Sequence, residues 1–309
     1  MGDICTRITS ALLLSILCAI PANAQKRLNV VTTLPDLKSI TEMIGGDHVD
    51  VFSIATGYQN PHFVDPKPSY ILRLSRADMF VTVGLDLELG WVPALVNSAR
   101  NSDIMRGGKG YVDASQGVPL LQVPTSVSRE QGDIHIYGNP HYWLHPALGK
   151  YIAQNIYNRL VALLPEARED FDRNLQHFNE ELDRRMEGWS RVMALFRGAR
   201  IIAYHNQWPY FENAFGLEIV DFLEPKPGIP PTPSQLAKII RTMQQQDLRV
   251  IIIAPYFKSD AAELVAREVG GIVVMLASSV GAVPEIETFF DLFDYNVDRI
   301  IEAFNQAAH

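Results

Sequence analysis

Apolar positions along the chain fall into two series of short β-branched runs, each followed by a segment with helical spacing. The runs of the first series span 29–34, 49–55 and 79–85, and those of the second span 199–205, 217–223, 249–255 and 271–276. Strands that alternate with helices in this way are typical of βα units around a parallel sheet. The pattern therefore predicts an α/β fold of two (β/α) lobes with parallel sheets.

A different pattern lies between the two series, where apolar residues recur at every third or fourth position from Phe171 to Phe196. This spacing predicts one amphipathic helix over 165–197, about 50 Å long at about 1.5 Å per residue. Since no heptad partner occurs elsewhere in the sequence, we expect a rigid strut packed along both lobes. The expected division is a signal peptide over 1–24, an N-terminal lobe over 25–164, the linking helix, and a C-terminal lobe over 198–309.

The start of the chain has the features of an export signal. A short apolar run, ALLLSILCAIP at 11–21, follows a basic residue and ends before the small-x-small triplet ANA at 22–24. These features predict a cleavable signal peptide, a mature chain that begins at Gln25, and a periplasmic location. The alternative is a lipid anchor on Cys18, which the bulky Leu17 before it disfavours.

Cysteine usage and charge narrow the possible functions. Both cysteines, Cys5 and Cys18, lie in the predicted signal, so no thiol is left for a disulfide or a cysteine-type zinc site. The chain carries 27 basic and 35 acidic residues, a formal net charge of −8, without a long run of either sign. A nucleic-acid partner is therefore not expected.

Three histidines occupy positions where open α/β sheets bind their ligands. His62 follows the strand at 49–55, His205 ends the strand at 199–205, and His141 lies just before a predicted helix. Because the carboxyl ends of parallel strands form the ligand crevice, we expect the three imidazoles to share one metal ion. Nitrogen ligands suit Zn²⁺ better than Mg²⁺ or Ca²⁺. Mn²⁺ is less favoured than Zn²⁺, and Cu²⁺ and Ni²⁺ stay open.

Two of these histidines end the same tripeptide, Asn-Pro-His, at 60–62 and at 139–141. Proline fixes its own φ and restricts the residue before it, so each histidine is presented from a stiff, non-helical corner. The other histidines are expected elsewhere. We expect solvent exposure for His48, His177 and His309, and a place behind the ligands or on the surface for His145.

Four segments, taken together, resemble the successive signatures of one family. They are TGYQNPHFVDPKPSYILRLSRADMFVTVGLDLELGW at 56–91, NPHYWLHP at 139–146, AYHNQWPYF at 203–211 and EPKPGIPPTPSQL at 224–236. They resemble the zinc/manganese solute-binding proteins of bacterial ABC importers, and the resemblance covers essentially the whole mature chain. It implies two lobes joined by a rigid helix, with the metal at their interface on His62, His141 and His205. Three histidines resemble the zinc-binding members, because the manganese-binding ones usually have a carboxylate at the third position.

The chain departs from the family pattern at the fourth ligand. The family typically has an aspartate after the last strand of the second lobe, but 273–285 contains no acid before Glu285. We favour Glu224 for this position over Glu285 and Asp260, with water as the alternative. The long histidine- and acid-rich loop of many zinc-binding relatives is also missing, which leaves His135 as a single candidate for recruiting metal.

The predicted function is a periplasmic receptor, and not an enzyme, that binds Zn²⁺ in an interlobe cleft and delivers it to an ABC importer. The expected partners are the importer's permease in the inner membrane and a periplasmic metallochaperone, and the expected state is a monomer. A zinc hydrolase is the rival hypothesis, although the sequence has no His-Glu-x-x-His. A receptor for a chelated metal or a siderophore is the third, because Trp143, Tyr204 and Trp208 lie beside the predicted ligands.

Overall fold

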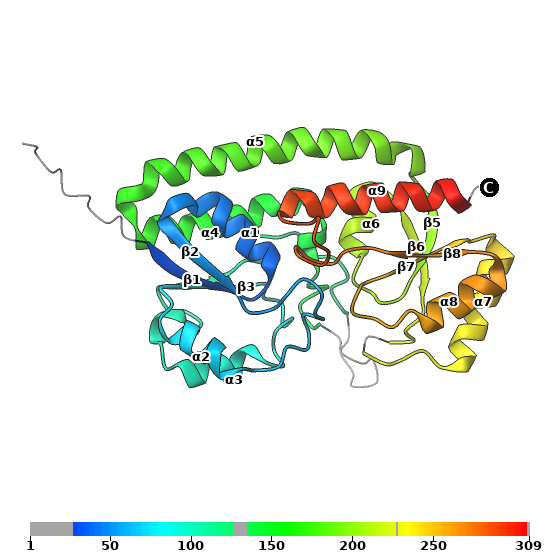
Figure 1. Cartoon of the computed structure of the whole chain (residues 1–309), viewed down its shortest axis with the longest axis horizontal. Coiled ribbons are helices and arrows are strands. Elements are labelled where there is room, and N and C mark those ends of the chain that lie inside the picture. Colours follow the sequence, from blue (N-terminus) through cyan, green and yellow to red (C-terminus); the bar gives the residue numbers. More distant parts are fainter. Residues whose placement is uncertain (1–26, 126–134, 227, 308–309) are drawn as a thin grey trace, which may run out of the picture.

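The computed structural model describes residues 27–125, 135–226 and 228–307 and contains two parallel sheets (Figure 1). The first has the order β2-β1-β3-β4 and the second the order β6-β5-β7-β8, so the two lobes share one topology. The predicted α/β fold of two lobes is confirmed. The strands are β1 (Leu28–Thr32), β2 (Val49–Ser53), β3 (Met79–Thr82), β4 (Tyr111–Asp113), β5 (Arg200–Ala203), β6 (Glu218–Phe222), β7 (Val250–Ile253) and β8 (Ile272–Met275). Only β4 was missing from the predicted strands.

Helices cover the two sheets, and proline in the first turn begins several of them, since its fixed φ suits that position. Those of the first lobe are α1 (Pro35–Gly45), α2 (Pro68–Ser75), α3 (Val92–Ala99) and α4 (Gly149–Leu163). Those of the second are α6 (Pro209–Phe215), α7 (Pro233–Gln246) and α8 (Asp260–Val269). The helices leave the carboxyl ends of the strands free to carry the loops that hold the site.

The predicted strut is helix α5 (Arg168–Met193), extended at either end by the 3₁₀ turns Pro165–Ala167 and Ala194–Phe196. It runs along both lobes, and helix α9 (Phe289–Ala307) lies beside it (Figure 1). Phe178 stacks on Phe290 with ring centroids 5.3 Å apart, and Trp189 Nε1 donates to Asp294 Oδ1 at 2.7 Å. Helix α9 was not among the predicted elements, although its aromatic residues supply the surface against which the strut packs.

Further contacts join the lobes close to the strand ends. Trp143 Nε1 of the first lobe donates to the main-chain oxygen of Ser278 in the second at 2.9 Å. The fully buried carboxyl of Asp36 accepts from the main-chain nitrogen of Val280 at 3.1 Å and from the Ser279 hydroxyl. Burial raises the pKa of Asp36 to about 6. The lobes therefore meet through buried hydrogen bonds as well as through the strut.

The structure corrects one expectation about the histidines. His48 is buried, with its Nε2 2.7 Å from Asp170 Oδ2 and its ring against Phe171 at 5.3 Å between centroids, and not in solvent as predicted. His177 is exposed, as expected. The position of His309 lies outside the described residues.

The predicted signal peptide, including Cys5 and Cys18, also lies outside the described residues. Among the helices of the described part of the chain, none combines the length and apolar character needed to cross a membrane.

Candidate metal centre

The three predicted histidines converge between the lobes. His62 lies on the loop after β2, His141 starts the 3₁₀ turn Tyr142–Leu144, and His205 follows β5 by two residues. Each offers one ring nitrogen, and these three nitrogens all lie within 4.8 Å of one another. The ring centroids are 5.2 Å apart for His62 and His141, and 5.8 Å for each of their distances to His205. One small cation can therefore contact all three rings.

The repeated Asn-Pro-His tripeptide forms the same structure in both copies. In the first, Asn60 Oδ1 lies 3.0 Å from the main-chain nitrogen of His62 and 2.9 Å from its Nδ1. In the second, Asn139 Oδ1 makes the same two contacts with His141 at 3.1 and 2.9 Å. An amide oxygen can only accept, so Nδ1 of each ring carries the proton and Nε2 presents its lone pair. The tripeptide thus fixes both the direction and the tautomer of an imidazole ligand.

His205 is oriented by a carboxylate instead. Strands β5 and β6 pair in parallel with Ala203 opposite Phe222, so the residues two positions further on, His205 and Glu224, lie side by side. Glu224 Oε2 is 2.6 Å from Nδ1 of His205, and both side chains are buried. Nδ1 therefore donates to the carboxylate, which leaves Nε2 of His205 for a metal. Glu224, the predicted fourth ligand, contacts the Nδ1 of His205 in this structure.

The electrostatics of the site favour neutral imidazoles at His62 and His141. His141 is 2% exposed, and its Nε2 has no hydrogen-bond partner among the described residues. Burial, and then the neighbouring histidines, hold the pKa of both His62 and His141 well below the usual value. A buried polar atom without a partner costs about 1–3 kcal/mol, a cost that a bound cation would remove. The donor set therefore fits a metal ion that prefers neutral nitrogen ligands.

A fourth imidazole, that of His135, also reaches the cluster. His135 Nε2 lies 3.0 Å from His62 Nε2, and the His135 ring centroid is 5.1 Å from that of His62 and 6.3 Å from that of His141. The sequence indicated His135 only as a recruiter of metal. The sequence around it, Gly-Asp-Ile-His at 132–135, offered no signal for this contact.

The remaining predicted candidates lie elsewhere. Glu285 and Asp260, the weighed alternatives for the fourth ligand, are both exposed, and Asp260 begins helix α8. His145 is half-buried, and its Nδ1 accepts from the main-chain nitrogen of Ala147 at 3.2 Å. Its role is to cap the 3₁₀ turn Pro146–Leu148.

The aromatic residues beside the ligands enclose the site. Trp143 is 1% exposed, and its ring lies 5.3 Å from that of His141. Tyr204 stacks on Phe257 at 4.4 Å, and the Phe257 ring is 5.7 Å from that of His205. These rings pack on the imidazoles and on each other, and they lower the dielectric constant around the cluster.

An amide bridge that the sequence did not reveal joins the two lobes beside the cluster. Asn139 Nδ2 donates to the main-chain oxygen of Asn206 at 2.9 Å and to Gln122 Oε1 at 3.1 Å. Asn206 Nδ2 donates to the same Gln122 oxygen at 2.8 Å. Nearby, the main-chain nitrogen of Leu121 donates to the Tyr210 hydroxyl at 3.0 Å. These bonds connect the residue that orients His141 to the neighbour of His205.

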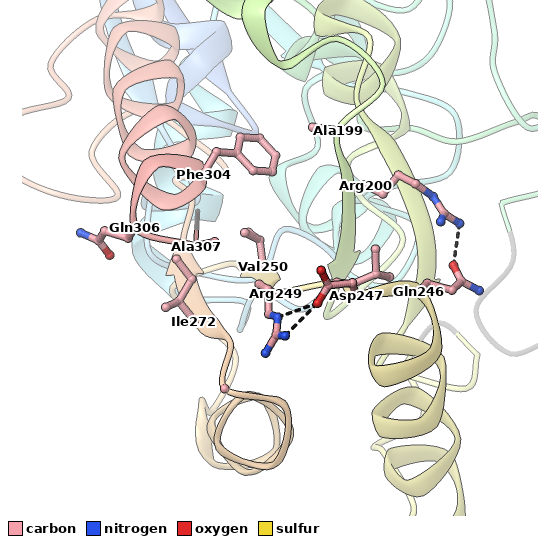
Figure 2. A pocket seen from close by; sticks show the side chains of 12 residues that line it. Ala199, Arg200, Gln246, Asp247, Arg249, Val250, Ile272, Phe304, Gln306 and Ala307 are labelled. Carbon is pink, nitrogen blue, oxygen red and sulfur yellow. Dashed lines mark hydrogen bonds and ion pairs between the residues drawn. The ribbon is translucent and has the colours of Figure 1, made fainter. Parts of the chain in front are cut away.

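A cavity of about 710 Å³ lies at the amino-terminal ends of strands in the second sheet (Figure 2). Its lining includes Arg200 and Val250, the first residues of β5 and β7. The guanidinium groups there are already bonded, Arg200 to Gln246 at 2.6 Å and Arg249 to Asp247 at 2.8 Å. The imidazole cluster at the carboxyl ends of the strands is therefore the better candidate site.

Two parallel α/β lobes held by a long helix, with a buried imidazole cluster between them, define a solute-binding protein for a metal ion. The model of the family "Zinc-uptake complex component A periplasmic" matches residues 30–303, and the chain belongs to this family. Its members are substrate-binding proteins of ABC transporters and not enzymes.

The chain is also similar to individual proteins over nearly its whole length. It is 24% identical to a manganese ABC transporter substrate-binding lipoprotein of Streptococcus anginosus, with 92% of each chain covered. It is equally similar to a metal ABC transporter substrate-binding lipoprotein of Streptococcus parasanguinis, again with 92% of each covered. A crystal structure of ZnuA superposes with a TM-score of 0.77 at 25% identity, over 90% of this chain and 99% of that one.

Proposed function

We propose that this protein captures Zn²⁺ between its lobes and delivers it to an ABC importer. The observation that carries the proposal is the convergence of His62, His141 and His205, whose ligand nitrogens lie within 4.8 Å of one another. Asn60, Asn139 and Glu224 hold the opposite nitrogen of the respective rings, as the partners of metal-binding histidines commonly do.

Zinc is the cargo that this donor set favours over manganese. Neutral imidazole is a borderline ligand that suits Zn²⁺, whereas Mn²⁺ prefers carboxylate, carbonyl and water oxygen. Glu224, the carboxylate nearest to these rings among the contacts described, is engaged with Nδ1 of His205. The manganese named for the streptococcal relative is the alternative cargo, and only a competition experiment decides between the two ions.

Delivery requires that this protein meets its membrane-embedded partner from the periplasmic side. We propose a periplasmic protein with a cleaved signal over 1–24, acting as a monomer on the permease of its importer, and loaded either directly or by a metallochaperone. The lobes are those proposed from the sequence, 25–164 and 198–309, linked by 165–197. Because helix α5 and the buried interlobe bonds hold them together, we expect metal release to need local movement of the ligand loops and not a wide hinge opening.

The test begins with metal analysis of protein purified without added metal, followed by competition among Zn²⁺, Mn²⁺, Cu²⁺ and Ni²⁺. Zn²⁺ is expected to win against Mn²⁺. Changing His62, His141 or His205 singly to Ala should weaken Zn²⁺ binding in calorimetry by well over tenfold. Even the loss of a residue that only hydrogen-bonds to a metal ligand lowers metal affinity by about 10- to 100-fold.

His177→Ala is the matched control, because His177 is an exposed histidine on helix α5. It should bind Zn²⁺ as the wild type does. Wild-type affinity in all three ligand variants would reject the site. Preferential binding of Mn²⁺ by the wild type would reject the cargo while leaving metal transport intact.

A further inference from the structure

We infer that His135 is the fourth ligand, so that the metal is held by four imidazoles and Glu224 acts only through His205. This inference rests on the proposed function and deepens it, because it assigns the position that the sequence left open. The sequence predicts no helix or strand around His135. With His135 as the fourth ligand, all four ligand atoms are nitrogens.

The first support is distance. Four imidazoles at about 2.0–2.1 Å from a tetrahedral Zn²⁺ have nitrogens about 3.4 Å apart and ring centroids about 5 Å apart. His135 Nε2 and His62 Nε2 are separated by 3.0 Å, and their centroids by 5.1 Å. The 6.3 Å between the His135 and His141 centroids is only slightly more open than the 5.8 Å between His141 and His205. His135 is not in the group of histidines whose ligand nitrogens lie within 4.8 Å of one another, so it has to shift toward His141 and His205 to complete the tetrahedron.

The second support is the direction of the lone pairs. The Asn60 oxygen accepts a hydrogen bond from the Nδ1–H of His62, so His62 Nε2 carries a lone pair and faces the Nε2 of His135. Without metal, His135 satisfies this atom by donating its own Nε2 proton. With metal, His135 adopts the other neutral tautomer, in which the ring proton is on Nδ1 and Nε2 binds the ion. The contact thus places the His135 nitrogen beside the lone pair of His62 that is expected to bind the cation.

The third support is that His135 lies in a turn held by main-chain hydrogen bonds. The main-chain nitrogen of Gly138 donates to the His135 carbonyl at 3.2 Å, and that of Asn139 donates to the Leu121 carbonyl at 2.9 Å. Gly138 has a φ of 119°, a conformation that side chains rarely adopt, and a Cβ there would approach Leu121 O to 3.1 Å. The turn therefore fixes the path of the chain from His135 to the ligand His141.

The position of Glu224 agrees with this assignment. Its Oε2 lies 2.6 Å from the Nδ1 of His205, on the nitrogen opposite to the one that faces the cluster. A carboxylate that accepts this hydrogen bond makes the ring a more basic ligand without occupying a coordination position. With His135 in the fourth position, the ion would have no oxygen ligand from these residues, which favours Zn²⁺ over Mn²⁺.

The experiment compares His135→Ala with Tyr137→Ala, an exposed side chain on the same turn. We expect His135→Ala to weaken Zn²⁺ binding in a chelator competition by at least about 10- to 100-fold, the effect of losing a residue that only hydrogen-bonds to a metal ligand. The variant should also show a smaller preference for Zn²⁺ over Mn²⁺. Tyr137→Ala should bind as the wild type does. Thermal unfolding in excess chelator should be the same for Tyr137→Ala and the wild type, and slightly lower for His135→Ala, which loses the hydrogen bond to His62.

A second variant separates ligation from structure. In Co²⁺-loaded His135→Gly, the visible absorption of the ion should change, and added free imidazole should restore the wild-type spectrum by filling the open position. Wild-type affinity and an unchanged Co²⁺ spectrum in both His135 variants would overturn the inference while leaving the three-histidine site in place. A wild-type protein that binds neither Zn²⁺ nor Co²⁺ would instead end the proposed function, and this inference with it.

Discussion

The side-chain amide of Asn139 in the first lobe donates to the main-chain oxygen of Asn206 in the second at 2.9 Å. The oxygen of the same amide orients His141, and Asn206 directly follows His205. One side chain therefore sets the position of a ligand from the first lobe relative to a ligand from the second. The two halves of the site are connected before a metal arrives, and this reduces the ordering cost of binding.

The two Asn-Pro-His copies provide a matched pair of variants. Asn60 orients His62, whereas Asn139 orients His141 and also bonds across the lobes. We expect Asn60→Ala to weaken Zn²⁺ binding by about 10- to 100-fold, the usual effect of losing the partner behind a ligand. Asn139→Ala should weaken it more and should also lower the melting temperature in chelator. Competition titration and calorimetric unfolding measure the two effects.

Asn139→Asp separates the two roles of this residue. A carboxylate can still accept from the Nδ1 of His141, but it cannot donate to Asn206. The variant should therefore keep more of the Zn²⁺ affinity than Asn139→Ala and still lose stability without metal. Equal affinities for the Ala variants at positions 60 and 139 would show that the interlobe bond contributes nothing to binding.

Glu224→Gln tests the carboxylate behind His205. The amide oxygen of Gln can accept from Nδ1, but it lacks the charge that makes the ring basic. We expect a loss of Zn²⁺ affinity of about 10-fold, with the Co²⁺ absorption spectrum retained because the coordination number stays the same. A changed spectrum would mean that Glu224 is itself a ligand, and an unchanged affinity would mean that it has no role in binding.

Much of the site could be predicted from the local pattern of apolar residues and from the rule that ligands bind at the carboxyl ends of parallel strands. The β-branched runs indicated the strands, and parallel strands place their carboxyl ends at one edge, where His62 and His205 follow. The stiff corner of Asn-Pro-His was also readable from proline. The function of its asparagine was not, since two hydrogen bonds to a residue two positions on become visible only in three dimensions.

What the sequence could not reveal depends on contacts between distant segments. Glu224 meets His205 because β6 pairs with β5 in one particular register, which the strand patterns alone do not determine. His48 is buried in the fold, where it packs on Phe171 and hydrogen-bonds to Asp170, 122 positions along the chain. His135 was visible as a histidine, but nothing in its neighbours indicated that it reaches His62.

The buried carboxyl of Asp36 should make the interlobe contact sensitive to pH. Its pKa of about 6 lies above the unfolded value of 3.8, so the folded state binds the proton more tightly. The stability contributed by this group is therefore present at low pH and is lost as the pH rises from about 4 to about 6. Relative to Asp36→Asn, the wild type should lose about 1 kcal/mol of unfolding free energy between about pH 5 and pH 7.

Urea denaturation in chelator at the two pH values measures this difference. The comparison with Asp36→Asn removes the titration of the histidines, which is common to both proteins. The Asn side chain can still accept from the main-chain nitrogen of Val280, so the contact is largely preserved. A wild type that gains stability over the variant as the pH rises would show that the hydrogen bonds from Ser279 and Val280 outweigh burial.

Gly57 marks a close approach between the loop that carries His62 and the second lobe. A Cβ at this position would lie 2.1 Å from the Val280 carbonyl oxygen and 2.3 Å from the Ala282 nitrogen, so the backbone has to move. Gly188 offers the opposite case, because it lies exposed within helix α5 and a Cβ there meets nothing within 4 Å. Substitution by alanine is therefore expected to lower the free energy of unfolding at Gly57 and to raise it at Gly188.

Gly57→Ala should destabilise the metal-free protein by about 1–3 kcal/mol, as overpacking of a tight contact does, and should weaken Zn²⁺ binding because the loop of His62 is displaced. Gly188→Ala should stabilise it by about 0.5–1 kcal/mol, since alanine loses less backbone freedom in a helix, and should leave Zn²⁺ binding unchanged. Denaturation in chelator and competition titration give both quantities. If Gly57→Ala bound Zn²⁺ as tightly as the wild type, the ligand loop could adjust independently of the lobe contact, and the site would not depend on how closely the lobes pack.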